Sequence, residues 1–166
     1  MAEKPRKELD ALELLMQDHR EVESLFREFE YLQKKAGTTA GVIDIACAEL
    51  KMHDTVENDV FYPAVSKAAA HAEETEALLD AAEDAHDAVM ALIDDLDAMD
   101  TDGARNAQFM LIIENVQAHV AAEETTLFPA VRKHPLDLLA LSTEMKRRKA
   151  ELMSERGLNE ADAEAV

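Results

Sequence analysis

Two copies of one pattern, a histidine followed four residues later by a glutamate, are the most chemically suggestive feature of the chain. They are His53-Asp-Thr-Val-Glu57 and His119-Val-Ala-Ala-Glu123. Residues four apart share one face of a helix, so each imidazole would lie beside a carboxylate. Mixed imidazole and carboxylate ligation favours iron or manganese over the soft metals that sulfur ligands select. The pattern therefore predicts a metal site.

The two copies belong to an internal repeat. Each is followed by a pair that contains an aromatic residue and then by Pro-Ala-Val, beginning at Pro63 and at Pro129. Each also has an upstream histidine, since His19 lies 34 residues before His53 and His86 lies 33 before His119. The repeat thus gives one candidate ligand set: His19, His53, Glu57, His86, His119 and Glu123.

Four long helices are expected to position these residues. Apolar residues at helical spacing, with turn residues at the breaks, predict helices over about 7–35, 41–69, 72–99 and 104–134. A shorter amphipathic helix over about 136–153 and a polar tail over 154–166 follow. Short loops between long helices favour an all-α, up-down-up-down four-helix bundle with a short C-terminal extra helix. The predicted domain is 1–153.

Antiparallel helices would bring the four histidines to one level. Each lies about 15 to 19 residues from the nearest expected turn, and an α-helix rises ~1.5 Å per residue. A single histidine on an apolar helix face is more commonly a packed core residue, but the repeat argues against that interpretation for the whole set. Four imidazoles and two carboxylates in an apolar core are costly without a cation. Six ligands suit two octahedral ions, with Glu57 and Glu123 bridging.

Composition limits the partners. The net charge is -19, from 36 acidic and 17 basic residues, which disfavours nucleic acid and anionic lipid. No segment is apolar over the ~18 residues that span a membrane. The one cysteine, Cys47, rules out a disulfide within the chain, and the charged start of the sequence does not resemble a signal peptide. We expect a cytoplasmic protein, monomeric or homodimeric through the 136–153 helix.

These motifs resemble the hemerythrin-like, or HHE cation-binding, family. The resemblance rests on Asp18-His19-Arg20-Glu21, the two His-x-x-x-Glu copies, His86 and Pro129, and it covers about 9–134. It implies a four-helix bundle with a di-iron centre, for which manganese or zinc would be substitutes, and chemistry with oxygen, nitric oxide or peroxide. It implies one set of ligands: His19, His53, Glu57, His86, His119 and Glu123.

The chain departs from the respiratory hemerythrins at one place. Those proteins carry a second histidine one turn after the first on the third helix, and here that place is Met90. The departure leaves more open coordination and gives weight to redox chemistry or sensing over simple oxygen carriage.

Several functions therefore stay open. The first is a di-iron protein that binds or senses a small oxidant. The alternatives are a redox enzyme on the same centre, with catalase-like peroxide breakdown or nitric oxide handling, iron storage or donation, and a bundle without metal. We see no activated nucleophile and no phosphate-binding loop.

Other residues have weaker expectations. Glu23, Glu49 and Glu83 lie about one turn from a ligating histidine and could orient it, and Glu49 could serve as a seventh ligand. Tyr62 is interpreted as a packing residue, with a redox or hydrogen-bonding phenol as the alternative. Pro63 and Pro129 are expected to bend or end their helices. Five side chains are expected in the core: Met16, Cys47, Met52, Met90 and Met110. His71 and His134 are expected to be exposed at helix ends.

Overall fold

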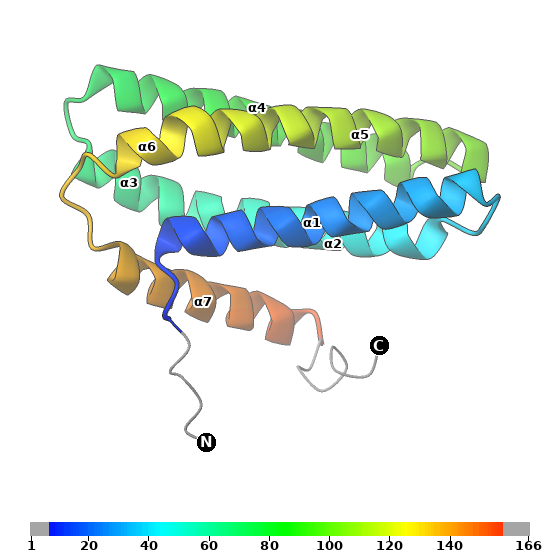
Figure 1. Ribbon diagram of the computed structural model, residues 1–166, viewed down its shortest axis with the longest axis horizontal. Coiled ribbons are helices and arrows are strands. Elements are labelled where there is room, and N and C mark those ends of the chain that lie inside the picture. The colour runs from blue at the N-terminus through cyan, green and yellow to red at the C-terminus, as the bar shows by residue number, and fades with distance from the viewer. Residues whose placement is uncertain (1–6, 158–166) are drawn as a thin grey trace.

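The computed structural model describes residues 7–157, and the regular elements in that range are helices. Four rods lie antiparallel (Figure 1). The first is α1 (Ala11–Lys34) and the third is α4 (Glu73–Asp97). The second rod runs through α2 (Ala40–Val56), η1 (Glu57–Phe61) and α3 (Tyr62–Ala68), and the fourth through α5 (Asp102–Ala122), η2 (Glu123–Leu127) and α6 (Phe128–Val131). The predicted all-α four-helix bundle is confirmed.

The extra helix, α7 (Leu138–Glu155), lies along the side of the bundle instead of across its end (Figure 1). It contacts α1, α2 and η1, and it buries Leu141, Met145 and Leu152 against them. The helix ends two residues later than the predicted Met153. The predicted polar tail, 154–166, lies beyond the described residues from 158 onward.

Three of the helices, α1, α5 and α7, begin at a residue whose side chain caps the first turn. The Asp10 carboxylate accepts a hydrogen bond of 2.9 Å from the Glu13 amide, and the Glu13 carboxylate accepts one of 3.1 Å from the Asp10 amide. This reciprocal capping box satisfies amides that the first helical turn leaves unpaired. Thr101 caps α5 and Asp137 caps α7, each with one side-chain oxygen that accepts a hydrogen bond from a backbone amide. These caps fix where α1, α5 and α7 start, whereas α2 and α4 begin without a side-chain cap among the described residues.

Two apolar clusters fill the bundle, one on each side of the histidine level. The first cluster includes Leu12, Leu15, Phe61 and Val65, which precede His19 or follow Glu57. The second cluster holds residues on the other side of the histidines in every rod: Val22, Phe26, Phe29, Ile43, Ile93, Phe109 and Ile112. The polar groups therefore lie in a layer between two dry cores, which position that layer from both ends.

The sequence predicts that Pro63 and Pro129 bend or end their helices. The rods that carry the two glutamates do not end there, because each continues as an α-helix past its proline. In each rod a π-helical turn interrupts the α-helix and begins at the glutamate. The Tyr62 amide donates to the Glu57 carbonyl, and the Phe128 amide donates to the Glu123 carbonyl. Pro63 and Pro129 follow directly, and a proline inside a helix lacks an N–H and crowds the carbonyl four residues before it. A wider π turn relieves that crowding.

Two of the four methionines expected in the core are exposed. Met52 is buried and Met90 is half-buried, but Met16 and Met110 are 37% and 53% exposed. Each of the exposed pair follows a fully buried residue, Leu15 or Phe109, which takes the direction of the core. A step of one residue turns the side chain by about 100° on a helix. Cys47 is buried as expected, and burial raises the pKa of its thiol to about 11.

The described helices give no evidence of a membrane span, because none of them is both long enough and apolar enough to cross a bilayer.

Candidate metal centre

The six candidate ligands lie together in the middle of the bundle. His19 comes from α1, His53 from α2, His86 from α4 and His119 from α5, while Glu57 and Glu123 are the first residues of the two π turns. All six side chains are at most 10% exposed, and Glu57 is fully buried. The predicted residues therefore share one buried position.

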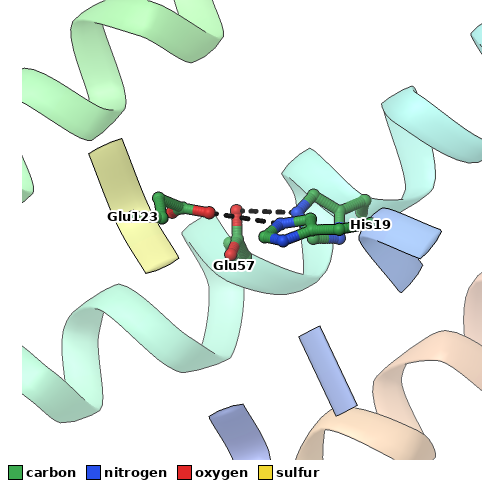
Figure 2. A group of neighbouring side chains, drawn as sticks. His19, Glu57 and Glu123 are labelled. Atoms are coloured by element: carbon green, nitrogen blue, oxygen red, sulfur yellow. Dashed lines mark ion pairs between the residues drawn. The ribbon is translucent and has the colours of Figure 1, made fainter. Parts of the chain in front are cut away.

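Each carboxylate faces one imidazole from each half of the repeat. Oε2 of Glu57 lies 3.2 Å from Nε2 of His53 and 3.0 Å from Nε2 of His86. Oε2 of Glu123 lies 3.3 Å from Nε2 of His19 and 3.4 Å from Nε2 of His119. Figure 2 shows Glu57 between Glu123 and His19, with their polar atoms pointing toward one another. This geometry would allow both carboxylates to bridge two cations.

The candidate ligands form two overlapping groups, in each of which one atom per residue lies within 4.8 Å of the others. His19 and His53 make up one group together with the two glutamates. His86 and His119 make up the other with the same two glutamates. Two cations could thus be held side by side, with a pair of histidines on each and both carboxylates shared.

Several buried polar atoms of this cluster have no hydrogen-bond partner within the described chain. They include Nε2 of His19, Nε2 of His53, Oε1 of Glu57 and Oε2 of Glu123. In addition, Nε2 of His86 and Nε2 of His119 converge to 2.9 Å. Unpaired buried polar atoms are uncommon in native proteins because each one costs free energy. Cations between the lone pairs would satisfy all of these atoms, so the residues fit a metal centre.

The pKa values of the buried groups also indicate that positive charge is stabilised at this position. Burial lowers the pKa of His53, but the Glu57 and Asp18 carboxylates outweigh it and raise the pKa well above its ordinary value. Burial raises the pKa of Glu57, but His53 and His86 outweigh it and hold the pKa well below its ordinary value. The carboxylate is therefore ionised, and protons on His53 and His86, whose pKa values are both raised, supply the positive charge that a cation would supply.

Three further carboxylates hold the outer nitrogens of the imidazoles. Glu124 Oε1 lies 2.9 Å from Nδ1 of His19, Asp54 Oδ1 lies 2.9 Å from Nδ1 of His86, and Asp18 Oδ2 lies 3.5 Å from Nδ1 of His53. Of these three contacts, only the one between Glu124 and His19 has hydrogen-bond geometry, and those of Asp18 and Asp54 are ion-pair contacts by distance. A carboxylate beside Nδ1 favours the tautomer in which Nε2 offers its lone pair inward. Lys149 of α7 in turn holds Asp18, at 2.8 Å.

Sequence reasoning missed these three acids and named others. Glu23 pairs with Arg20 at 2.8 Å, Glu83 is exposed, and Glu49 is half-buried without an ion pair to His53. One signal was available, because each acid adjoins a candidate ligand in the chain. It serves a ligand on a different rod, however, and helical spacing along one rod does not reveal that pairing.

His119 lacks an equivalent acid. Among residues 7–157, no carboxylate forms an ion pair with its Nδ1, and the repeat counterpart of Asp18 is Ala85. Burial lowers the pKa of His119, and Glu123 does not fully offset it. The His86 and His119 side of the centre is therefore less fully surrounded by acids than the His19 and His53 side.

Tyr62 belongs to the site and is not a packing residue alone. Its hydroxyl donates a hydrogen bond of 2.8 Å to Glu123 Oε1 and lies 3.2 Å from Glu57 Oε2. Burial and the two carboxylates raise the pKa of this phenol, so it stays protonated. The π turn explains the contact, since it stacks residue 62 over residue 57.

A small cavity of about 30 Å³ adjoins the imidazoles on the side away from Tyr62. Beyond the four histidines its walls are largely apolar: Val22, Leu50, Val89, Met90, Val116 and Val120. A single water needs ~10–15 Å³ of this kind of space. The cavity therefore has room for a molecule of two or three heavy atoms, and Met90 forms part of its wall.

The two remaining histidines lie outside the centre. His71 is exposed in the turn after α3, as expected. His134 is half-buried, contrary to expectation, because its Nε2 lies 2.9 Å from the Thr75 hydroxyl.

Comparison with known families agrees with this geometry. A family model described as the hemerythrin HHE cation binding domain matches residues 10–131. That range is about three quarters of the chain and includes all six candidate ligands, while α7 lies outside it. Comparisons with curated proteins and with solved structures gave no significant match.

Proposed function

The chain belongs to the hemerythrin HHE cation-binding family, and from this premise we propose that it is a non-haem di-iron protein that binds or senses a small oxidant, such as O₂, NO or peroxide. The observation that supports the proposal most strongly is the pair of overlapping histidine and glutamate groups around shared carboxylates. Nitrogen and oxygen ligands without sulfur suit iron, with manganese or zinc as substitutes.

The proposed ligand roles follow from the distances. His19 and His53 would hold one ion, His86 and His119 the other, and Glu57 and Glu123 would bridge the pair. When bound, a pair of iron ions supplies reversible electron exchange with a small oxidant.

The surrounding residues would perform the tasks that the ions do not. Asp18, Asp54 and Glu124 hold three imidazoles in the ligating orientation. Tyr62 donates a hydrogen bond into the bridging pair and could follow changes in its charge. The apolar cavity admits a molecule of diatomic size and excludes large polar substrates.

Metal analysis and an optical spectrum of freshly purified protein test the proposal. We expect about two irons per chain, as six ligands in two shared groups imply, and a near-ultraviolet band from an oxygen-bridged pair. Glu57→Gln and Glu123→Gln should each lose at least one metal. Glu49→Gln removes a neighbouring half-buried carboxylate that is outside the cluster, so it should keep the full content. Full metal content in both of the first two variants would refute the bridging assignment.

Turnover separates binding from catalysis. A reduced protein that forms a stable oxygen adduct and does not consume added peroxide supports the binding role. Sustained peroxide loss would favour the enzymatic alternative, and ready loss of iron to a mild chelator would favour storage or donation.

A further inference from the structure

A groove on the outside of the bundle leads to the candidate metal centre. It lies between α4 and the α5–η2 rod and encloses about 120 Å³. Its walls include Ala81 and Ala85 from α4 and Ala122 and Thr126 from the other rod. His119 and Glu123, two of the six candidate ligands, also line it. Of these wall residues, Ala81, Ala122 and Thr126 are exposed and Ala85 is half-buried, so the groove is open to solvent.

The internal repeat shows how unusual this opening is. The first half of the chain carries larger side chains at most of the matching positions, although Leu78 matches the smaller Ala11. Leu14 stands where the second half has Ala81, and Asp18 where it has Ala85. Val56 likewise stands in place of Ala122, and Val60 in place of Thr126. Because the second half has smaller side chains at these four positions, it has an open passage where the first half is packed.

The matching face of the first half is also covered. There α7 packs on α1, α2 and η1, and Lys149 reaches over Asp18 toward His53. A space of only about 10 Å³ remains among these residues. Within the described chain, no helix covers the groove between α4 and α5. Access to the centre is therefore unequal on the two sides.

We propose that this groove is the route by which a small neutral molecule reaches the centre, arriving on the His86 and His119 side. The inference rests on the proposed function for the identity of the molecule, but the passage itself is a property of the chain. His119 is the imidazole without an outer carboxylate, since Ala85 replaces the acid, and the same substitution that opens the passage leaves this ligand less constrained.

The side chains that line the groove favour a small neutral molecule over an ion. Methyl groups from four alanines and the side chains of Leu78 and Leu127 form most of the walls, with the Thr126 hydroxyl as a polar exception beside the two candidate ligands. The net charge of -19 repels anions approaching the surface. Dissolved O₂ and NO meet both conditions, whereas nitrite and superoxide do not.

The first test uses metal-free protein, so that it does not depend on the iron proposal. Dissolved O₂ is paramagnetic and speeds the relaxation of protons that it visits. We expect strong relaxation at the Ala85 methyl and at Thr126, and little at Leu14 and Val60 of the covered face. The variant Ala81→Leu/Ala122→Val, which gives the groove the residues of the first half, should abolish the enhancement at Ala85. Equal enhancement on both faces would overturn the proposal.

The second test measures entry to the loaded centre by stopped-flow mixing with NO. The groove variant should bind NO about tenfold more slowly at unchanged metal content. Ala88→Leu/Ala121→Val places the same side chains at exposed alanines of the same two helices outside the groove, and it should bind at the native rate. A native rate in the groove variant would refute this route. If the purified protein held no iron, the proposed function would be refuted instead. The O₂ relaxation measurement on metal-free protein would still test whether the groove is the route.

Discussion

Oη of Tyr62 donates a hydrogen bond of 2.8 Å to Oε1 of Glu123, a carboxylate that belongs to the other half of the repeat. The same hydroxyl lies 3.2 Å from Glu57. The second half has Phe128 at the equivalent position, and its ring stacks on His19 with centroids 6.0 Å apart. The repeat is therefore symmetric in its candidate ligands but not in the aromatic residue beside them, because Tyr62 carries a hydroxyl that donates to the carboxylates and Phe128 does not.

Tyr62→Phe should keep the fold, because Phe128 shows that a phenyl ring suits this position. The metal-free variant should lose about 1–3 kcal/mol in free energy of unfolding, since buried charged acceptors lose their donor. Denaturant titration with a chelator present measures this loss. Tyr31→Phe removes a hydroxyl from a residue that is 61% exposed and should have no such effect. Equal stabilities of the two variants would contradict the role of the hydrogen bond.

The stability of the metal-free protein should fall between about pH 6.5 and 9. Burial lowers the pKa of His86, but Asp54 and Glu57 outweigh it and raise the pKa to about 9. Below pH 6.5, His86 is protonated in both the folded and the unfolded protein, and its contribution to stability is fully present. As pH rises toward 9, the unfolded protein no longer binds this proton and the folded protein begins to lose it, so the contribution disappears. The loss is about 3 kcal/mol for this group, and thermal unfolding against pH measures it.

Bound metal should reverse that trend. Ligation needs neutral imidazole, so protons compete with the metal and its affinity rises with pH. The difference in Tm between loaded and metal-free protein should therefore widen from pH 6.5 to 9. A constant difference across this range would show that the imidazoles are not ligands. His134→Gln changes a histidine outside the centre, so the difference in Tm between loaded and metal-free protein should widen with pH as it does in the native protein.

Asp18→Asn should weaken metal binding by about 10–100-fold, the usual effect of removing a carboxylate that orients a ligating imidazole. Asp18 pairs with both His53 and Lys149, and it is charged because burial, which raises its pKa, is outweighed by these partners. Competition with a chelator of known affinity measures the change. Asp87→Asn removes an exposed acid next to His86 and serves as the control. Equal affinities would mean that His53 is oriented by packing alone.

The bundle and the clustering of the six side chains could be expected from the sequence because both follow from distances along a helix. Apolar spacing sets which face is buried, and the distance from each turn sets the level of each histidine. Glu57 and Glu123 share a face with His53 and His119 for the same reason. The match to the family model confirms the resemblance that these motifs indicated. The ligand roles themselves stay a prediction.

The features that sequence reasoning missed depend on contacts between rods. Asp54 of α2 pairs with His86 of α4. Lys149 reaches Asp18 only because α7 lies along the bundle. Spacing along one helix contains no information about such pairs. The π turns were also missed, because a proline signals a disturbed helix without specifying whether the helix ends, bends or widens. The contact of Tyr62 depends on such a turn, because on a regular α-helix its side chain would point about 140° away from Glu57.

Pro63→Ala tests whether the proline maintains that alignment. Alanine would supply the missing N–H and remove the ring that crowds the Asp59 carbonyl, so a regular α-helix could replace the π turn that begins at Glu57. Tyr62 would then rotate away from Glu57, and metal affinity should fall by about tenfold, the lower end for a displaced supporting residue. Pro135→Ala changes an exposed proline outside the bundle rods and should have no effect on affinity. Native affinity in Pro63→Ala would mean that packing around Glu57, which is fully buried, holds the turn open without the proline.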